Sequence, residues 1–255
     1  MTRHSDKAEL FRSMHMPHKP LILCNVWDAG SAKAVQQAGA RAIATSSWSV
    51  AAAQGYEDGE ELPIDTALSV TDRIVRSLDL PVTVDFEGGY AADPSAVGQN
   101  VHRLLALGVV GLNFEDQKVN GLGLYTVPEQ VARLSAIRRA AEALGVRVFI
   151  NARTDVFLKA APDADHAGLL DEAVARAAAY AQAGADGVFV PGLKDTSLIT
   201  RFCARVPLPV NVMTARSQDI GALAVTGVSR ISLGPNPYID LIAALEHEAR
   251  ACITG

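Results

Sequence analysis

Short apolar stretches recur along the chain, and each is followed by a longer segment whose apolar residues return with helical spacing. The stretches fall at 21–27, 42–48, 81–87, 109–115, 147–153, 187–191, 209–213 and 230–234. Strands of this length that alternate with helices are typical of parallel sheets covered by helices. Eight such units in a chain of 255 residues predict an α/β fold, a single-domain (β/α)8 TIM barrel.

The segment before the first strand and the helix boundaries refine this picture. Residues 1–18 carry a short helical pattern, which predicts a capping helix at one end of the barrel. Asp65 is expected to cap the helix that follows the second strand, and Pro128 to occupy the first turn of a later one. Because no linker divides the chain, residues 1–255 are expected to form one domain.

Polar side chains gather near the carboxyl ends of the predicted strands. Successive side chains of a strand point to opposite faces, so Asp85 and Glu87 share one face while Val84 and Phe86 share the other. The same alternation places further polar residues on the inner face: Asn25, Ser47, Asn113, Glu115, Asn151, Arg153, Asn211 and Ser232. Barrel enzymes carry their chemistry at the C-terminal ends of the strands, so we expect the active site there.

Composition and charge narrow the class of partner. Hydrophobic residues make up 49% of the chain and charged residues 20%, with a formal net charge of −5. Nucleic acid and anionic membranes are therefore unexpected partners, and a small-molecule ligand fits better. Three scattered cysteines, Cys24, Cys203 and Cys252, indicate neither a disulfide framework nor a zinc site. With no apolar leader and no membrane-spanning run, the expected location is the cytoplasm.

The acidic side chains on the inner face need a counter-charge. Asp85, Glu87 and Glu115 could form salt bridges with Arg153, but one arginine cannot neutralise three carboxylates. Oxygen ligands without a histidine on these strands suit a hard cation, Mg²⁺ or Mn²⁺, bound largely through water. Arg153 either pairs with Asp155 or Glu115 or binds a substrate carboxylate. We favour the second role, since a metal would already occupy the acidic groups.

Other polar positions allow a structural as well as a functional interpretation. Asp58 lies in the polar insert 55–61 and is either a solvated turn residue or part of a loop over the site. Ser46 and Ser47 either offer donors to an anion or cap a turn. Three asparagines could instead have a structural role, in which they hydrogen-bond buried backbone groups: Asn25, Asn151 and Asn211.

Six segments of the chain, taken in order, resemble the isocitrate lyase/phosphoenolpyruvate mutase superfamily. They are Asn25-Val26-Trp27-Asp28-Ala29-Gly30-Ser31-Ala32, Thr45-Ser46-Ser47, Gly55-Tyr56-Glu57-Asp58-Gly59, Val84-Asp85-Phe86-Glu87-Gly88-Gly89-Tyr90, Asn113-Phe114-Glu115-Asp116 and Ile150-Asn151-Ala152-Arg153-Thr154-Asp155. Each segment is a weak signal alone, but together they have the family's order and spacing over nearly the whole chain.

The resemblance implies roles for individual residues. Asp85 resembles the family's principal Mg²⁺ carboxylate, and Glu87 and Glu115 resemble the outer ligands that hold metal-bound water. Arg153 resembles the arginine that binds the substrate carboxylate, and Asp58 the aspartate of a mobile loop. The other implied substrate contacts are Ser46, Ser47, Asn211 and Trp27.

One loop departs from the family pattern. Lyases of the superfamily carry a catalytic cysteine in a Lys-Lys-Cys-Gly-His segment after the fourth strand, whereas residues 117–126 here contain no cysteine. Lys118 and Asn120 are similar to the lysine and asparagine that phosphonomutases use in this loop, so both are candidate catalytic residues. The loop leaves open whether a C–C or a C–P bond is broken.

These residues and the resemblance predict a Mg²⁺-dependent enzyme that acts on a small 2-oxo or 2-hydroxy acid through a metal-stabilised enolate. Its reaction would be that of a C–C lyase, a decarboxylase or a phosphonomutase. The missing cysteine also allows a homologue that binds an oxyacid without turning it over. A Schiff-base aldolase is disfavoured because no lysine lies within a predicted strand. The resemblance further implies a homo-oligomer, a dimer or tetramer, and we expect a plain one rather than one with a swapped C-terminal tail.

Overall fold

The strands form one parallel sheet that curls into a barrel. The computed structural model describes residues 3–119, 121–215 and 220–254. In these ranges nine strands pair in the order β1-β9-β8-β7-β6-β5-β4-β3-β2. Their bounds are β1 (Leu21–Leu23), β2 (Asn25–Val26), β3 (Ile43–Thr45), β4 (Val82–Asp85), β5 (Gly111–Glu115), β6 (Phe149–Arg153), β7 (Gly187–Phe189), β8 (Val210–Met213) and β9 (Arg230–Ser232). The barrel predicted from the apolar pattern is confirmed.

The two short strands at the start of the chain are one strand of the barrel interrupted at Cys24. β1 pairs with β9 and β2 pairs with β3, so this broken strand closes the sheet on itself. Asn25 completes the seam with its side chain. Its Nδ2 donates to the carbonyl of Thr45 at 2.8 Å. Its Oδ1 accepts from the backbone N–H groups of Leu233 and Gly234 at 3.1 and 2.9 Å. These bonds bear out the backbone-satisfying interpretation of Asn25.

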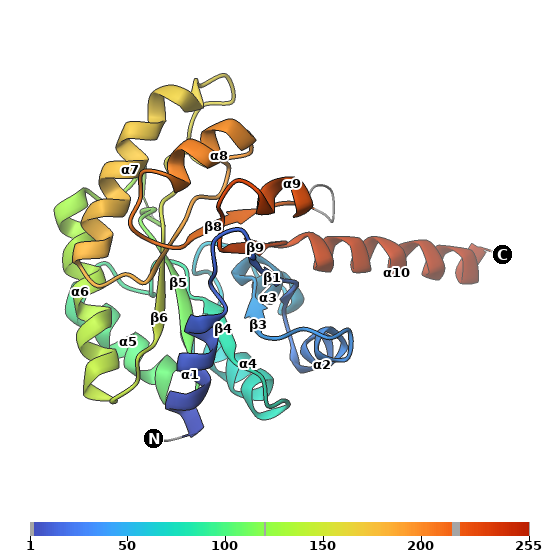
Figure 1. Ribbon diagram of the computed structural model, residues 1–255. Coiled ribbons are helices and arrows are strands. Elements are labelled where there is room, and N and C mark those ends of the chain that lie inside the picture. The colour runs from blue at the N-terminus through green and yellow to red at the C-terminus, as the bar shows by residue number, and fades with distance from the viewer. Residues whose placement is uncertain (1–2, 120, 216–219, 255) are drawn as a thin grey trace.

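Helices surround the barrel on its outer side (Figure 1). Their bounds are α1 (Arg3–Ser13), α2 (Ala29–Gln37), α3 (Ser47–Ala53), α4 (Ile64–Arg76), α5 (Pro94–Ala106), α6 (Val127–Ala143), α7 (His166–Gln182), α8 (Thr196–Cys203), α9 (Ile220–Ala224) and α10 (Asn236–Thr254). The last of them, α10, extends away from the barrel. No helix in the described part of the chain is long and apolar enough to cross a membrane.

Helix starts follow local capping chemistry, with one correction to the expectation. α6 begins after Thr126, which forms a capping box with Glu129, and Pro128 lies in its first turn as expected. Asp65 is not the cap of α4. That helix begins after Pro63, whose fixed φ suits a helix start, and the Asp65 carboxylate instead pairs with Arg103 on α5.

Apolar side chains fill the space between the barrel and its helices. Most outward-facing strand residues are buried, among them Val84, Leu112, Ile150, Val188, Val212 and Ile231. Burying a side chain of this size stabilises the fold by about 1.5–3 kcal/mol, so this layer dominates the stability. The inner face of the strands is then left to carry the polar groups.

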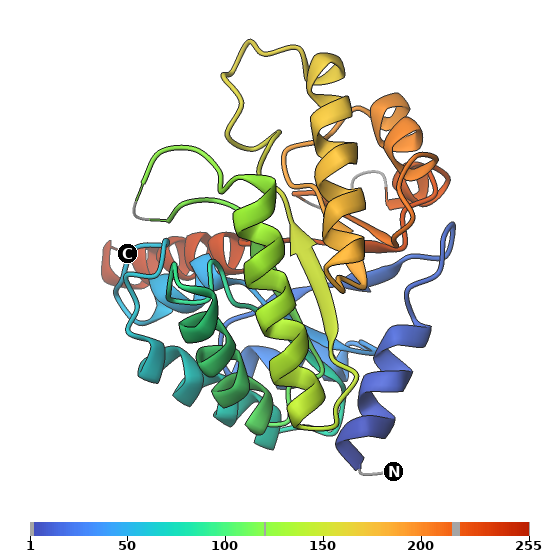
Figure 2. The same cartoon turned by 90° about the vertical axis from the view of Figure 1, so that its left-hand side faces the viewer.

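α1 lies at the end of the barrel where the strands begin (Figure 2). The ring of Phe11 meets Phe149 edge to face with centroids 5.7 Å apart, and His15 stacks on Phe149 at 3.9 Å. Gly111 on β5 makes room for this packing, because a Cβ there would lie 2.8 Å from the Phe11 ring. The opposite end of the barrel remains accessible for a site.

Candidate active site

A pocket of about 280 Å³ opens at the C-terminal ends of the strands. Its polar lining comes from strand ends and the segments that follow them: Asn25, Ser46, Ser47, Asp58, Asp85, Asn113, Arg153 and Ser232. The location is the one expected from the strand pattern. The pocket therefore collects most of the polar residues that the alternation placed inside the barrel.

Asp85 ends β4 and directs its carboxylate into this pocket. Its Oδ2 accepts from the hydroxyl and the backbone N–H of Ser47 at 3.1 and 3.4 Å. Its Oδ1 accepts from Nδ2 of Asn113 at 3.3 Å, and its own N–H donates to the Thr45 hydroxyl at 3.0 Å. Within the described residues Asp85 forms no ion pair. Neutral donors therefore hold a carboxylate that can still accept a cation.

Glu87 faces away from the pocket. Its Oε2 accepts from the backbone N–H groups of Gly59 and Glu60 at 3.0 and 2.8 Å, and its φ of 47° is unusual for a residue with a side chain. Burial, followed by the charges of Asp58 and Glu115, raises the pKa of Glu87 to about 9. The carboxyl group thus fastens the insert after β3 to the turn after β4.

Arg153 is held by two carboxylates. Its Nε and Nη2 donate to the two oxygens of Asp155 at 2.6 and 2.9 Å, and its Nη1 lies 2.9 Å from Glu115 Oε2. Burial opposes the charge, but Glu115 and Asp155 raise the pKa of Arg153 above its usual value. Burial raises the pKa of Glu115, and the Arg153 guanidinium partly offsets that rise. Arg153 lines the pocket as a permanently charged and oriented group.

Asp58 lines the same pocket, from the insert between α3 and α4. Burial, followed by the charge of Asp85, raises the pKa of Asp58. The insert is ordered by reciprocal bonds. Glu87 accepts from its backbone, and Oε1 of Glu60 accepts from the N–H of Tyr90 at 2.7 Å. Asp58 therefore lines the pocket from an ordered insert while it remains exposed to solvent, and its role over the site stays a prediction.

Comparison with known proteins shows which family the chain belongs to. A family model described as phosphoenolpyruvate phosphomutase matches residues 11–253. The chain belongs to this family. Its members are lyases, mutases and related enzymes of the phosphoenolpyruvate mutase/isocitrate lyase superfamily, so the resemblance found in the sequence is confirmed and the chain is an enzyme of this type.

Individual relatives of this phosphomutase family cover most of the chain. A Mycobacterium tuberculosis protein named only as uncharacterized is 32% identical, covering 96% of this chain and 89% of its own length. The 2-methylisocitrate lyase of Bacillus subtilis is 28% identical, covering 99% of this chain and 82% of its own. A crystal structure of a Burkholderia cenocepacia protein, provisionally named a phosphonomutase, has a TM-score of 0.94 at 48% identity, covering 99% of this chain and 100% of its own.

The serines after β3 lie where the family resemblance implies. Ser46 caps α3 by accepting from the Ser49 N–H at 3.4 Å, and both Ser46 and Ser47 line the pocket. The Ser47 hydroxyl is engaged by Asp85. The capping role of Ser46 is therefore observed, and contact of either serine with a substrate stays a prediction.

Two of the expected substrate contacts lie outside the pocket lining. Trp27 packs edge to face on Tyr238 of α10, with centroids 5.1 Å apart. Asn211 is buried inside the barrel, where its Nδ2 donates to the Val212 carbonyl at 2.7 Å and its Oδ1 accepts from Asn151 at 3.0 Å. Contact of either residue with a substrate stays a prediction.

The loop after β5 forms a hairpin beside the pocket. Gln117 bridges to Leu124, and the Lys118 N–H donates to the Gly123 carbonyl at 3.0 Å. The Lys118 ammonium sits 5.5 Å from the centre of the Tyr125 ring and lines a separate cavity of about 320 Å³. Among the described residues no lysine lines the 280 Å³ pocket, which disfavours Schiff-base chemistry. Asn120 lies outside the described residues.

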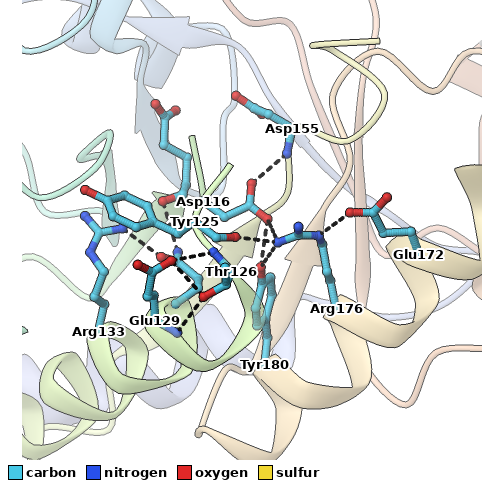
Figure 3. A network of polar contacts seen from close by, with 11 residues as sticks. Asp116, Tyr125, Thr126, Glu129, Arg133, Asp155, Glu172, Arg176 and Tyr180 are labelled. Carbon is cyan, nitrogen blue, oxygen red and sulfur yellow. Dashed lines mark hydrogen bonds and ion pairs between the residues drawn. The ribbon is translucent and has the colours of Figure 1, made fainter. Parts of the chain in front are cut away.

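A buried polar network, missed from the sequence, supports this hairpin and Arg153 together (Figure 3). Oδ1 of Asp116 accepts from the Asp155 N–H at 3.0 Å, and its Oδ2 accepts from the Tyr180 hydroxyl at 2.7 Å. Arg176 donates to Asp116 at 3.3 Å and to the Tyr125 carbonyl at 2.9 Å. Asp116 belongs to a family-like segment, but the alternation put it on the outer face. Arg176 gives no sequence signal because it lies within a helix.

The donor set fits a hard divalent cation that keeps much of its water. Among the described residues no three acidic, histidine or cysteine side chains converge closely enough to ligate one ion directly. Asp85 and Asp58 nevertheless offer carboxylate oxygens to the pocket. Mg²⁺ is commonly bound through one or two carboxylates and several waters. The carboxyl groups of Glu87 and Glu115 lie close enough to Asp85 and Asp58 to interact with their charges. Their expected role as outer ligands stays a prediction.

Proposed function

We propose that this protein is a Mg²⁺- or Mn²⁺-dependent enzyme that breaks a C–C or C–P bond in a small 2-oxo or 2-hydroxy carboxylic acid. The observation that carries the proposal is the placement of the Asp85 carboxylate and the Arg153 guanidinium in one pocket of about 280 Å³. A cation site and an anion site side by side suit a substrate that has a carboxylate next to a second oxygen.

Arg153 binds the substrate carboxylate in this proposal. Asp155 holds two of its nitrogens and Glu115 a third, which fixes the plane of the guanidinium before substrate arrives. The Phe189 ring centre lies 5.9 Å from the guanidinium carbon and limits movement on another side. A rigid clamp of this kind lowers the entropy cost of orienting the acid.

Asp85 holds the cation side of the pocket in this proposal. A divalent cation bound there supplies a Lewis acid that stabilises the negative charge of an enolate. The Ser47 and Asn113 donors keep the Asp85 carboxylate directed into the pocket. The insert that carries Asp58 is fixed on the same side of the pocket by hydrogen bonds to Glu87 and Glu60.

Asp58 is our candidate for the proton transfer that the loop cysteine performs in lyases of the superfamily. It lines the pocket, and its raised pKa brings the carboxyl group nearer to the range in which an acid both gives and takes a proton. Lys118 remains a candidate for a conformation in which it turns toward the pocket. Asn120, which lies outside the described residues, remains a candidate from the resemblance.

Two reaction types follow from the relatives. The name of the Bacillus subtilis relative points to cleavage of a 2-methylisocitrate-like C–C bond, and that of the Burkholderia cenocepacia protein to phosphonate chemistry. We therefore propose assays with oxaloacetate, 2-methylisocitrate and phosphonopyruvate, each with Mg²⁺ and with EDTA. EDTA should abolish any turnover.

Oxalate, an enolate mimic, gives the direct test of the site. With Mg²⁺ present, oxalate should raise the melting temperature of the protein, and EDTA should remove the effect. Absence of stabilisation would contradict the proposal. Stabilisation without turnover of any assayed acid would favour the oxyacid-binding alternative.

We also propose a homo-oligomer that forms through α10. In the described chain this helix has no buried residue, and its large apolar side chains are exposed: Ile239, Leu241, Ile242, Leu245 and Ile253. A second copy would cover them and would lie near the pocket, since Tyr238 on α10 packs against the pocket residue Trp48. Light scattering should give a dimer or tetramer that Leu241→Glu weakens. The cytoplasm remains the proposed location.

A further inference from the structure

Arg230 is a buried cation inside the barrel, below the pocket. It begins β9, and its side chain is 2% exposed. Its Nη2 donates to Oδ1 of Asn113 at 3.2 Å, while its Nε and Nη1 find no partner among the described residues. Burial lowers the pKa of Arg230 to about 10, and the charge of Asp85 opposes that fall. The guanidinium is therefore charged at neutral pH, in a place where an unpaired charge is costly.

Asn113 connects this charge to the candidate cation site. Its Oδ1 accepts from Arg230 and from Nδ2 of Asn151 at 2.9 Å. A guanidinium can donate but not accept, so the oxygen end of the Asn113 amide must face Arg230. The Nδ2 end is then left to donate to Oδ1 of Asp85, which lies 3.3 Å away.

Asn211 fixes the same orientation from another side. Its Nδ2 donates to the Val212 carbonyl, which can only accept, so its Oδ1 must receive Nδ2 of Asn151. The Asn151 amide donates to both neighbours in turn. The Val212 carbonyl thus fixes the orientation of the Asn211 amide, and Arg230 fixes that of the Asn113 amide. Both orientations are consistent with the Asn113 N–H group donating to Asp85.

We propose that Arg230 is a positioning residue for Asp85. Through Asn113 it sets the direction in which the Asp85 carboxylate faces the cation. Because its own positive charge repels a cation, its contribution to affinity comes through this orientation and not through its charge. This inference rests on the proposed function, because it assumes that Asp85 binds a divalent cation.

The test measures Mn²⁺ binding to the full chain, by the electron paramagnetic resonance signal of free Mn²⁺, with Mg²⁺ as competitor. Groups that orient metal ligands typically change affinity by about 10–100-fold, so we expect Arg230→Met to weaken Mn²⁺ binding roughly 10-fold. Arg230→Lys keeps an N–H donor for the Asn113 oxygen and should recover part of the loss. An affinity of Arg230→Met within twofold of the parent would overturn the inference.

Arg138→Met is the matched control. Arg138 is a partly buried arginine on α6 that pairs with Asp186 and donates to the Gly184 carbonyl, away from Asp85. The Arg138→Met substitution should lower thermal stability and leave Mn²⁺ affinity unchanged. An equal loss of affinity in Arg138→Met would show that general destabilisation explains the result, and would also overturn the inference.

A double-mutant cycle separates positioning from packing. Asn113→Ala removes the connecting amide, so Arg230→Met should add less than a twofold further loss in that background. Additive losses would mean that Arg230 does not act through Asn113. If Arg230→Met does not fold, Arg230→Lys takes its place in the cycle. Failure of the parent to bind Mn²⁺ or Mg²⁺ would instead overturn the proposed function, and the inference with it.

Discussion

The pocket has two unlike halves. On the side of β3 to β6, charged groups are held in place by polar contacts: Asp85 by the neutral donors of Ser47 and Asn113, and Arg153 by two carboxylates. On the side of β7 to β9, the lining is mainly apolar, from Phe189, Pro191, Met213 and Pro235. The charged half suits the carboxylate and oxo groups that all substrates of this kind share, whereas the apolar half suits the part that varies. Binding of the common group and choice of substrate are thus separated in space.

Asp85→Asn should have the largest effect and should act on every substrate alike. The amide keeps the size of the side chain but loses the charge that binds the cation. We expect a loss in kcat/KM of roughly 10³-fold and loss of Mn²⁺ binding. Asp72→Asn, on the outer surface of α4, is the control and should behave like the parent. A loss of kcat/KM confined to one substrate would contradict the assignment of the charged half to the group that all substrates share.

Arg153→Lys should follow, with a loss in kcat/KM of roughly 100-fold. Lysine keeps a charge but cannot hold Asp155, Glu115 and a substrate carboxylate in one plane. Most of the loss should appear as a higher KM in steady-state kinetics. Arg103→Lys, at a surface ion pair, should leave kinetics unchanged. A normal KM for Arg153→Lys would exclude the clamp.

Met213→Ala should change selectivity with less effect on catalysis. Removing the side chain enlarges the apolar half, so the ratio of kcat/KM between a bulkier and a smaller acid should rise about 10-fold. Met213→Leu, of similar volume, should keep the parent ratio. If instead all substrates lost activity equally, the apolar half would belong to the common binding site.

The smallest expected effect concerns the protonation of Glu87, which supports the charged half from outside the pocket lining. The raised pKa of Glu87, about 9, means that its neutral form favours the fold. This stabilisation is present below its ordinary value near 4.5 and is lost as pH rises through about 9. In EDTA, the melting temperature should fall by a few degrees between pH 6 and 9. Glu87→Gln should flatten that slope, and an unchanged slope would contradict the assignment.

The strand alternation predicted which face of the sheet a residue occupies, but not how deep below the pocket it lies inside the barrel. Asp85 and Arg153 end their strands and reach the pocket as expected, whereas Asn211 lies lower and bonds within the barrel. Arg230 shares a face with Ser232 and could have been found from the same alternation. Depth depends on the stagger between strands, which pairs Asn211 with Arg230 across β8 and β9 and which no single strand encodes.

Contacts with residues elsewhere in the folded chain account for the other differences between prediction and structure. Asp65 satisfies the sequence rule for a helix cap, but Pro63 already starts the helix and Arg103 on α5 takes the carboxylate. Lys118 was placed by resemblance, and the hairpin directs it to Tyr125 and a neighbouring cavity. Motif order located the catalytic region, but only the folded chain shows which loop residues face it.

The fastening of the hairpin has a consequence for how the family diversifies. Its ends are joined by the Tyr125 N–H, which donates to the Asp116 carbonyl at 2.7 Å, and Arg176 ties both ends to α7. We therefore expect that the tip between these two ends can be replaced without disturbing the hydrogen bonds that hold Arg153 in place. Grafting the cysteine-bearing tip of a lyase onto this base is a direct route to a new reaction on an unchanged barrel.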